Sequence, residues 1–222
     1  MKLEGIPREM IALRVSKEIK DGDYVNLGIG IPTLVSNWIE GKDVILQSEI
    51  GMLKTGPLAD EDMVNQDLIN ASCQAVIELP GTVYFDILES FTMIRGGRMG
   101  VVVMGAMQVT DRGDYAGWAN PERGLDIGNI GGSMDLCAGA KKLFLAMEHT
   151  TKEGAPKVVK HLTFPATTAG KVNMIFTDLA VMEITHKGLL LKEVAPGLTA
   201  KDIQSVTEPK LIVSPDLKEI EF

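Results

Sequence analysis

A strand, a glycine-rich loop, a helix and a second strand follow one another within residues 24–46, and this order restricts the fold more than any other feature of the chain. Residues 24–27 and 44–46 have the apolar character of short buried strands, and residues 33–39 carry four apolar side chains on one helical stripe. Two strands joined through a helix form a parallel pair with a right-handed crossover. We therefore predict an α/β fold with an open, mostly parallel sheet flanked by helices.

Apolar periodicity and turn residues place further elements along the chain. Segments 51–67, 111–129 and 150–160 are polar or glycine-rich, and we expect them to be loops. We see neither an internal repeat nor a linker, so residues 1–222 are expected to form a single domain. The remaining predictions are helices at 7–20, 86–94 and 199–206, strands at 74–78, 99–109, 142–147 and 172–176, and a hairpin of residues 180–185 and 188–194.

The stretch Gln47-Ser48-Glu49-Ile50-Gly51 directly follows the predicted strand at 44–46. In open α/β sheets, ligands bind in the crevice outside the carboxyl ends of the strands. A carboxylate at that position can act as a nucleophile, a general base or a ligand clamp. The alternative is a solvated loop glutamate, and the spacing alone favours neither interpretation.

Two glycine pairs are candidate binding loops. Gly28 and Gly30 lie between the first strand and the following helix, and Gly131 and Gly132 precede a short predicted helix. Backbone N–H groups at such places attract anions and can stabilise an oxyanion. The alternative is that these glycines only serve tight turns.

The loop at Gly28 and Gly30 also has a partial dinucleotide-binding pattern, with Glu49 where a ribose-binding acid would sit. Thr33 occupies the position of the third glycine, however, and Pro32 intrudes into the loop. These two departures disfavour a dinucleotide.

Composition excludes several classes of protein. The net charge of −8 and the absence of a run of basic residues argue against a nucleic-acid partner. No apolar run approaches the length of a membrane span, and residues 1–7 lack the core of a signal peptide. Cys73 and Cys137 have no metal-type spacing, which favours free thiols in a reducing compartment, with Cys137 buried and inert. We expect a cytoplasmic protein without a membrane segment.

The three histidines, His149, His161 and His186, have no second ligand at a spacing that a metal site needs. A serine hydrolase would require a G-x-S-x-G motif, which the chain lacks. We interpret the histidines as surface residues and expect no metal. The segment 95–98 (RGGR) could hold an anion, but such arginines are more often solvated.

Taken together, the motifs resemble the β subunit of family I CoA-transferases, the 3-oxoacid or acetoacetate (acetate, butyrate) type. The resemblance covers nearly the whole chain in order, and the combination is specific although each motif alone is modest. The matching segments are 26–32 (NLGIGIP), 48–51 (SEIG), 94–97 (IRGG), 104–109 (MGAMQV), 131–135 (GGSMD), 146–149 (AMEH) and 190–193.

The resemblance implies a CoA-transferase that moves CoA between an acyl-CoA and a free short-chain carboxylic acid by a ping-pong mechanism. Glu49 would be the nucleophile, passing through a mixed anhydride and a glutamyl-CoA thioester. Coenzyme A is then a co-substrate, and no other cofactor is implied. Backbone amides near Gly28, Gly30, Gly131 and Gly132 would serve the oxyanion. The family also implies a separate α subunit, and hence a hetero-oligomer with the active site near the subunit interface.

Several positions depart from the family pattern. Ile50 stands where an asparagine usually follows the catalytic glutamate, Lys54 replaces a glycine, and Gly117 replaces the asparagine of an Asn-Trp pair. Residues 121–124 (PERG) replace a Pro-Gly-Lys pattern. Because Ile50 removes a polar neighbour of Glu49, it leaves an acyl-CoA hydrolase as an alternative, with a non-enzymatic ligand-binding relative as a third hypothesis.

Overall fold

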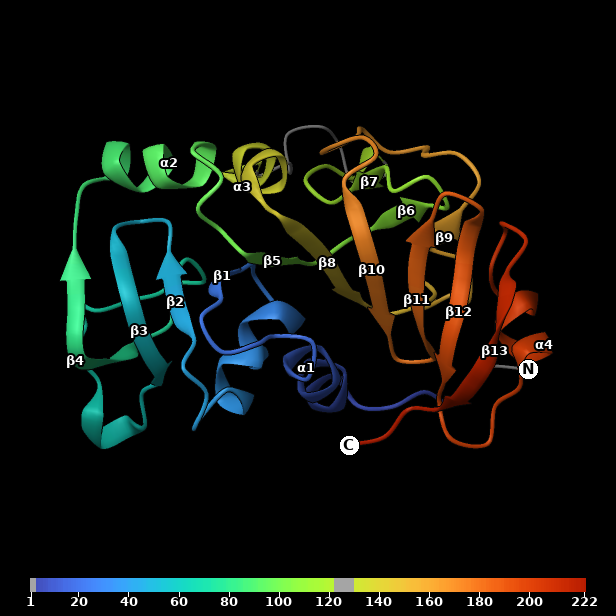
Figure 1. Ribbon diagram of the computed structural model, residues 1–222, viewed down its shortest axis with the longest axis horizontal. Coiled ribbons are helices and arrows are strands. Elements are labelled where there is room, and N and C mark those ends of the chain that lie inside the picture. The colour runs from blue at the N-terminus through green and yellow to red at the C-terminus, as the bar shows by residue number, and fades with distance from the viewer. Residues whose placement is uncertain (1–2, 122–129) are drawn as a thin grey trace.

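The computed structural model describes residues 3–121 and 130–222, which contain two β-sheets (Figure 1). Gly128 and Asn129, which precede the second glycine pair, and the departure at 122–124 lie outside the described residues. The helices are α1 (Arg8–Ser16), η1 (Ile31–Trp38), η2 (Glu61–Met63), α2 (Ile87–Arg95), α3 (Ser133–Gly139) and α4 (Ala200–Ser205). The strands are β1 (Tyr24–Leu27), β2 (Ile45–Ser48), β3 (Met52–Leu58), β4 (Val76–Tyr84), β5 (Val101–Met104), β6 (Gln108–Thr110), β7 (Tyr115–Ala116), β8 (Lys142–Met147), β9 (Val158–Val159), β10 (Val172–Thr177), β11 (Ala180–Thr185), β12 (Gly188–Val194) and β13 (Ile212–Glu219).

The larger sheet has the strand order β13-β12-β11-β10-β8-β5-β1-β2-β3-β4. Its five middle strands, from β10 to β2, are parallel, whereas β3 and β4 at one end and β11 and β12 at the other are antiparallel additions. The predicted open, mostly parallel sheet in a single domain is confirmed. The chain passes from β1 to β2 on one side and later returns to β5 on the other side of β1. The carboxyl ends of β1 and β5 therefore form a topological switch point, where ligands of such sheets bind.

Side chains alternate between two hydrophobic cores along the central strands, as the two-residue repeat of a strand requires. In β5, Val101 and Val103 face one core, and Val102 and Met104 face the other. The neighbouring strand β8 alternates in the same way. Both strands are covered on both faces, which explains their uninterrupted apolar sequence.

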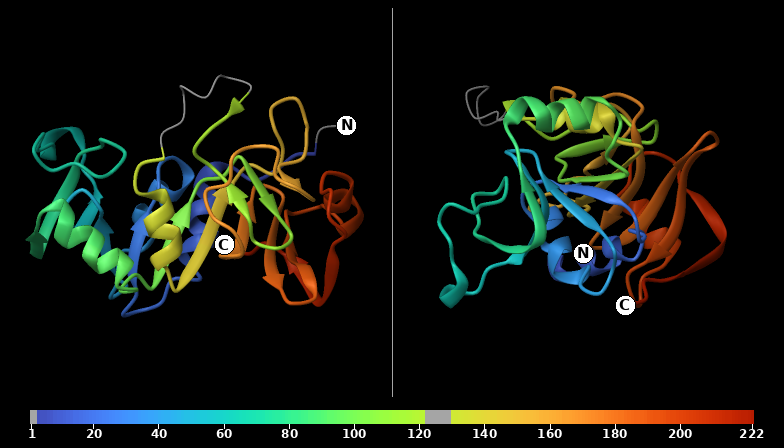
Figure 2. Two further views of the ribbon diagram at one scale, coloured as in Figure 1. Left: turned by 90° about the horizontal axis from the view of Figure 1, so that it is seen from above. Right: turned by 60° about the vertical axis from the view of Figure 1, so that its left-hand side comes forward.

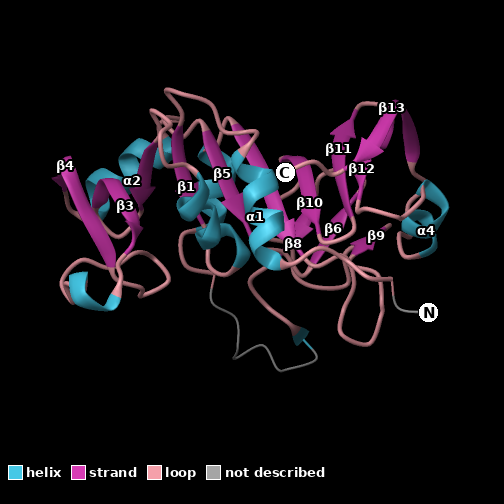
Figure 3. Cartoon of the chain, turned by 90° about the horizontal axis from the view of Figure 1, so that it is seen from below, coloured by secondary structure: helices cyan, strands magenta, loops and turns pink. Residues whose placement is uncertain are grey.

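Helices cover both faces of the large sheet. Buried residues of α1 and η1 belong to one core, and buried residues of α2 and α3 belong to the other (Figures 1 and 3). The small sheet, with the order β7-β6-β9, packs on the same face as α3 (Figure 2). The predicted βαβ unit is present, but its connecting helix is a 3-10 helix.

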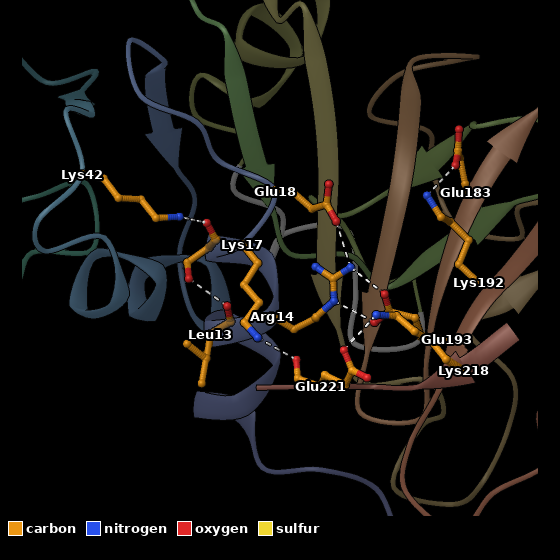
Figure 4. Close-up of polar contacts among 11 residues, drawn as sticks. Leu13, Arg14, Lys17, Glu18, Lys42, Glu183, Lys192, Glu193, Lys218 and Glu221 are labelled. Carbon is orange, nitrogen blue, oxygen red and sulfur yellow. Dashed lines mark hydrogen bonds and ion pairs between the residues drawn. The ribbon is translucent and has the colours of Figure 1, made fainter. Parts of the chain in front are cut away.

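A buried ion pair joins the first helix to the far end of the sheet (Figure 4). The Arg14 guanidinium donates two hydrogen bonds of 2.7 and 2.8 Å to the Glu193 carboxylate on β12, and a third of 2.8 Å to Glu18. The side chains of Arg14 and Glu193 are 9% and 6% exposed. Burial opposes the charge of Arg14, but its two carboxylate partners outweigh burial and raise its pKa. This pair fixes α1 against the antiparallel end of the sheet.

All three of the predicted loops contain strands, and the first of these loops is the segment 51–67. Residues 51–67 include β3, which forms a tight hairpin with β2, and β4 extends well beyond the predicted strand at 74–78. The turn residues that suggested loops lie within these strands, where Lys54 has φ +63° and Gly81 has φ +89° and the β3–β4 register shifts. β4 is the edge strand, and β3 pairs with β2 only through Met52 and Leu53. The remaining residues of β3 and those of β4 therefore have one free side, where such residues are tolerated.

The predicted strand at 99–109 is also divided. Its first part is β5, and after a break at Gly105 the chain continues as β6 in the small sheet. The short strand β7 lies in the predicted loop at 111–129, and β9 lies in that at 150–160. The break at Gly105 places the backbone of this segment beside the switch point, where a ligand can approach it closely.

Candidate active site

Glu49 lies in the tight turn of the hairpin between β2 and β3. Ser48 and Met52 pair across this hairpin, so Glu49 immediately follows the last residue of β2. Gly51 closes the turn with φ +132°, and a Cβ there would collide with the carbonyl oxygen of Phe85. Only glycine fits such a position. The turn holds Glu49 half-buried at the carboxyl end of a central strand.

The carboxylate of Glu49 accepts a hydrogen bond from a buried amide. Asn26 on β1 donates from Nδ2 to Oε2 of Glu49 over 3.1 Å, and the same nitrogen lies 2.9 Å from Oε1 of Gln47. Gln47 in turn donates from Nε2 to Oγ of Ser90 on α2 over 2.9 Å. Asn26, Gln47 and Ser90 are all buried. A continuous chain of side chains thus connects Glu49 to two strands and one helix.

A cavity of about 380 Å³ opens at the switch point between β1 and β5, and Glu49 lies on its wall. Gly28, Gly131 and Gly132 line the same cavity, so the fold brings together Glu49 and three of the four glycines that the sequence predicted. Gly30 lies in the same loop as Gly28 but is not among the described lining residues. The other described residues that line it are Asn26, Ile29, Ala71, Met104, Gly105, Ala106, Met107, Tyr115, Gly117, Ile130, Ser133 and Leu136.

The glycines of the cavity differ in what their backbone can offer. The N–H of Gly28 donates to the carbonyl of Val103 over 2.8 Å, so this amide is engaged in holding the loop against β5. A Cβ at Gly28 would also lie 3.1 Å from Sδ of Met104. Gly131 has φ +45° and, with Gly132, precedes the first turn of α3. The backbone N–H of Gly28, one of the predicted oxyanion donors, is therefore already hydrogen-bonded within the protein.

Tyr115 is a neutral side chain of the cavity wall, and the thiol of Cys137 lies beside it. Tyr115 is almost fully buried, and burial, followed by the neighbouring thiol, raises the pKa of its hydroxyl. Cys137 lies with its sulfur 3.7 Å from that hydroxyl, and burial raises the pKa of the thiol to about 11. The prediction that Cys137 is buried is confirmed, and both Cys137 and the exposed Cys73 are free cysteines. Among the described residues that line the cavity, Glu49 is the only one with a carboxylate, ammonium or guanidinium group.

The arrangement of a carboxylate, glycine loops and a cavity at the switch point can be compared with known proteins. The profile of the Coenzyme A transferase family matches residues 8–205. The chain belongs to this family. It is 42% identical over 206 residues to the B subunit of the succinyl-CoA:3-ketoacid coenzyme A transferase of Helicobacter pylori, covering 93% of this chain and 99% of that protein. It is also 42% identical over 207 residues to the B subunit of the 3-oxoadipate CoA-transferase of Pseudomonas putida, covering 93% of this chain and 97% of that protein.

The fold of this CoA-transferase β subunit also matches a solved structure. The crystal structure of an acyl-CoA transferase from Escherichia coli O157:H7 superimposes with a TM-score of 0.76 at 23% sequence identity. The match covers 99% of this chain and 44% of that longer chain. The predicted family and β-subunit type are confirmed.

The histidines and arginines that the sequence singled out lie outside the cavity. His161 and His186 are exposed as predicted, but the prediction for His149 was wrong because its ring is fully buried between two threonine hydroxyls. Arg95 pairs with Asp135 over 2.7 Å and so joins α2 to α3. Within residues 3–121 and 130–222, no cluster of three metal-binding side chains occurs, and no helix is long and apolar enough to cross a membrane.

Sequence reasoning missed Asn26 as a site residue, although a signal was present. Asn26 is the one polar residue in the four-residue strand β1 apart from the tyrosine at its start, and a buried polar side chain in a central strand needs a partner. Tyr115 of the cavity wall had no comparable signal, because its place depends on how distant segments pack, whereas Ser133 lies within the matching segment 131–135.

Proposed function

We propose that this CoA-transferase subunit uses Glu49 to move CoA between an acyl-CoA and a free short-chain 3-oxo acid. The observation that carries this proposal is the position of Glu49 on the wall of the switch-point cavity, together with three glycines of the family motifs. A carboxylate is a suitable nucleophile because its acyl adducts resemble in energy those of the substrate acids. The exchange then proceeds by covalent catalysis in two half-reactions.

In the first half-reaction, a carboxylate oxygen of Glu49 attacks the thioester carbonyl. The C–S bond breaks, which gives an acyl-glutamyl anhydride and a CoA thiolate. The thiolate then attacks the glutamyl carbonyl, which releases the first acid as its carboxylate and leaves a Glu49–CoA thioester. The second acid attacks that thioester, and the same steps in reverse deliver its acyl-CoA and free Glu49. Each step exchanges one C–S bond for one C–O bond or the reverse, so no oxidant, reductant or water is consumed.

Trapping the covalent adduct tests this proposal. We expect that incubation of the assembled enzyme with acyl-CoA, followed by borohydride or hydroxylamine, modifies Glu49 in peptide mass spectra. The variant Glu49→Ala should lose the modification and the exchange. Full activity of Glu49→Ala would contradict the proposal. CoA release that needs no acceptor acid would favour the hydrolase that the sequence left as an alternative.

The substrate class rests on the two relatives compared above. One is named for a 3-ketoacid and the other for 3-oxoadipate, which are both 3-oxo acids. Comparing kcat/KM for a 3-oxo acid with that for the saturated acid of equal length tests this assignment. We expect the 3-oxo acid to be preferred, and equal values would contradict the assignment.

The partner would be a separate α subunit, because both relatives are named as the B subunits of their enzymes. Exposed apolar side chains surround the Glu49 turn, where Phe85 N–H bonds to Gly51 and β4 forms the edge of the sheet. This apolar surface consists of Ile50, Val83, Tyr84, Ile87 and Leu88, which are between 47% and 75% exposed. Such clusters mark interaction sites, and this one adjoins the proposed nucleophile. We place the α subunit on this surface.

A pair of matched variants tests the surface. Val83 lies on edge strand β4, and Val213 lies on the opposite edge strand β13; they are 53% and 50% exposed. We expect Val83→Asp to weaken co-purification with a co-expressed α subunit while leaving the melting temperature of the isolated chain unchanged. Val213→Asp should have no effect on co-purification. Loss of the partner in Val213→Asp alone would refute the placement.

A further inference from the structure

The side chains that hold Glu49 have a role beyond the nucleophile itself. We propose that Asn26 is the positioning residue for the Glu49 carboxylate, and that Gln47 and Ser90 anchor it. The inference rests on the proposed function, since it assigns residues to the same reaction. Its basis is the unbroken sequence of hydrogen bonds from Ser90 through Gln47 and Asn26 to Glu49, of 2.9, 2.9 and 3.1 Å.

The orientation of the Asn26 amide follows from its surroundings. One terminal atom lies 3.1 Å from the backbone oxygen of Gln47 and 3.1 Å from the carboxylate of Glu49, which are acceptors under all conditions near neutral pH. That atom must therefore be the NH₂ nitrogen. A donor directed at one carboxylate oxygen restricts the rotation of Glu49 and leaves its other oxygen available for attack.

This orientation of the Asn26 amide is energetically unfavourable for its oxygen atom. With its nitrogen turned toward Gln47 and Glu49, Asn26 has its Oδ1 atom buried and without a hydrogen-bond partner among residues 3–121 and 130–222. A buried unpaired acceptor is destabilising and uncommon in native proteins. Sequences break such rules mainly at functional sites. The same orientation directs the amide nitrogen of Asn26 at Glu49, which supports a positioning role for this residue.

A substitution of the anchor Ser90 tests the proposal without changing a residue that lines the cavity. Ser90 is fully buried on α2 and is not among the described residues that line the cavity. In the complex with the α subunit, Ser90→Ala should lower kcat about 2- to 10-fold, the value of one hydrogen bond. Asn26→Ala should lower kcat by roughly 10- to 100-fold, as expected for a misplaced reacting group. In both variants KM should change little, because the substrates still enter the same cavity.

The pH profile separates positioning from a structural role. Asn26→Asp replaces the donor by a second carboxylate beside Glu49, which disfavours ionisation of both groups. The acidic limb of kcat/KM should therefore move to higher pH in Asn26→Asp. Gln204 is the matched control, since its amide makes three hydrogen bonds near α4, far along the chain from the cavity segments. Gln204→Ala should lower the melting temperature without moving kcat or the pH profile.

The outcomes also separate this inference from the proposed function. If Glu49→Ala abolishes exchange while Ser90→Ala and Asn26→Ala keep the wild-type kcat and pH profile, the positioning role is wrong and the nucleophile stands. If Glu49→Ala is active, the proposed function itself fails. A fall in melting temperature in Ser90→Ala with unchanged kcat would also overturn the inference, because it would show a purely structural hydrogen bond.

Discussion

His149 makes the stability of this subunit depend on pH, because its hydrogen bonds and its burial favour the neutral form of the ring. Its Nε2 and Nδ1 atoms each lie 2.9 Å from a threonine hydroxyl, of Thr207 and Thr177 respectively. Thr207 donates its hydrogen to the carbonyl of Ile203, so its oxygen accepts from Nε2–H. The Thr177 oxygen already accepts from two backbone amides and has no lone pair left for an Nδ1–H, and its own hydrogen lies within reach of Nδ1 at 2.9 Å and of the Ala180 carbonyl at 3.1 Å. The network therefore fits the neutral ring with its proton on Nε2.

Burial is the main cause that lowers the pKa of His149 from 6.5 to about 4, and the positive charge of Lys157 adds to it. The unfolded chain takes up the proton near pH 6.5, whereas the folded protein does so only near pH 4. Stability is therefore complete above about pH 6.5 and falls as the pH decreases toward 4. The difference between 6.5 and about 4 corresponds to about 3 kcal/mol of unfolding free energy.

The assay is urea unfolding of the wild type and of His149→Gln in the same series of buffers. Glu148, Lys157 and Asp178 lie in the same region and have shifted pKa values of their own, so the difference between the two proteins isolates the histidine. From pH 7 down to about pH 4 we expect the wild type to lose about 3 kcal/mol more than the variant. Parallel stability curves for the two proteins would refute the reasoning.

Three further predictions concern stability and are measured by urea unfolding. Lys54 has φ +63°, and its side chain makes only an exposed hydrogen bond from Nζ to the carbonyl of Pro80. Lys54→Gly should therefore be at least as stable as the wild type, whereas Lys54→Ala should be less stable by about 1 kcal/mol. Equal stabilities of the two variants would contradict this prediction. Gly51→Ala should cost more than Gly154→Ala, because both have positive φ but only the first meets a backbone oxygen; equal losses would show that the turn can relax. Arg14→Met should lower the free energy of unfolding by about 3–5 kcal/mol, because it leaves Glu193 buried and unpaired. The double variant Arg14→Met with Glu193→Met should lose less stability than Arg14→Met alone. Additive losses in this double-mutant cycle would refute the coupling of the two residues.

Local sequence patterns predicted the elements whose stability is local or whose strands are fully buried. The hairpin of β11 and β12 and the strand β8 have the predicted bounds, and the helix predicted at 199–206 begins with a capping box between Thr199 and Asp202. Each of these depends on residues close in sequence or on an uninterrupted apolar run.

The prediction failed where tertiary context overrides local preference. Residues 51–67 were predicted to be a loop and the strand at 74–78 was predicted to end before Pro80 and Gly81, but pairing between the two strands at the end of the sheet keeps these residues in β3 and β4. The sequence predicted His149 to be a surface residue, because nothing in the local pattern shows that Thr177 on β10 and Thr207, which follows α4, enclose its ring. Of the site, the motif order predicted Glu49 and the glycines of the cavity, whereas its supporting amides come from a three-dimensional neighbourhood that motif spacing does not encode.

The position of Ile50 changes the interpretation of the strongest departure from the family pattern. Ile50 is 47% exposed and is not among the described residues that line the cavity. The polar neighbour of the Glu49 carboxylate is Asn26, which comes from a different strand and does not depend on the residue at position 50. Ile50 belongs to the apolar surface that also contains Val83 and Leu88. Any effect of Ile50 on the choice of acid would therefore act through the protein that covers this surface. If the α subunit lies there, Ile50→Asn should alter acid preference only in the assembled enzyme, and it should leave the stability of the isolated chain unchanged.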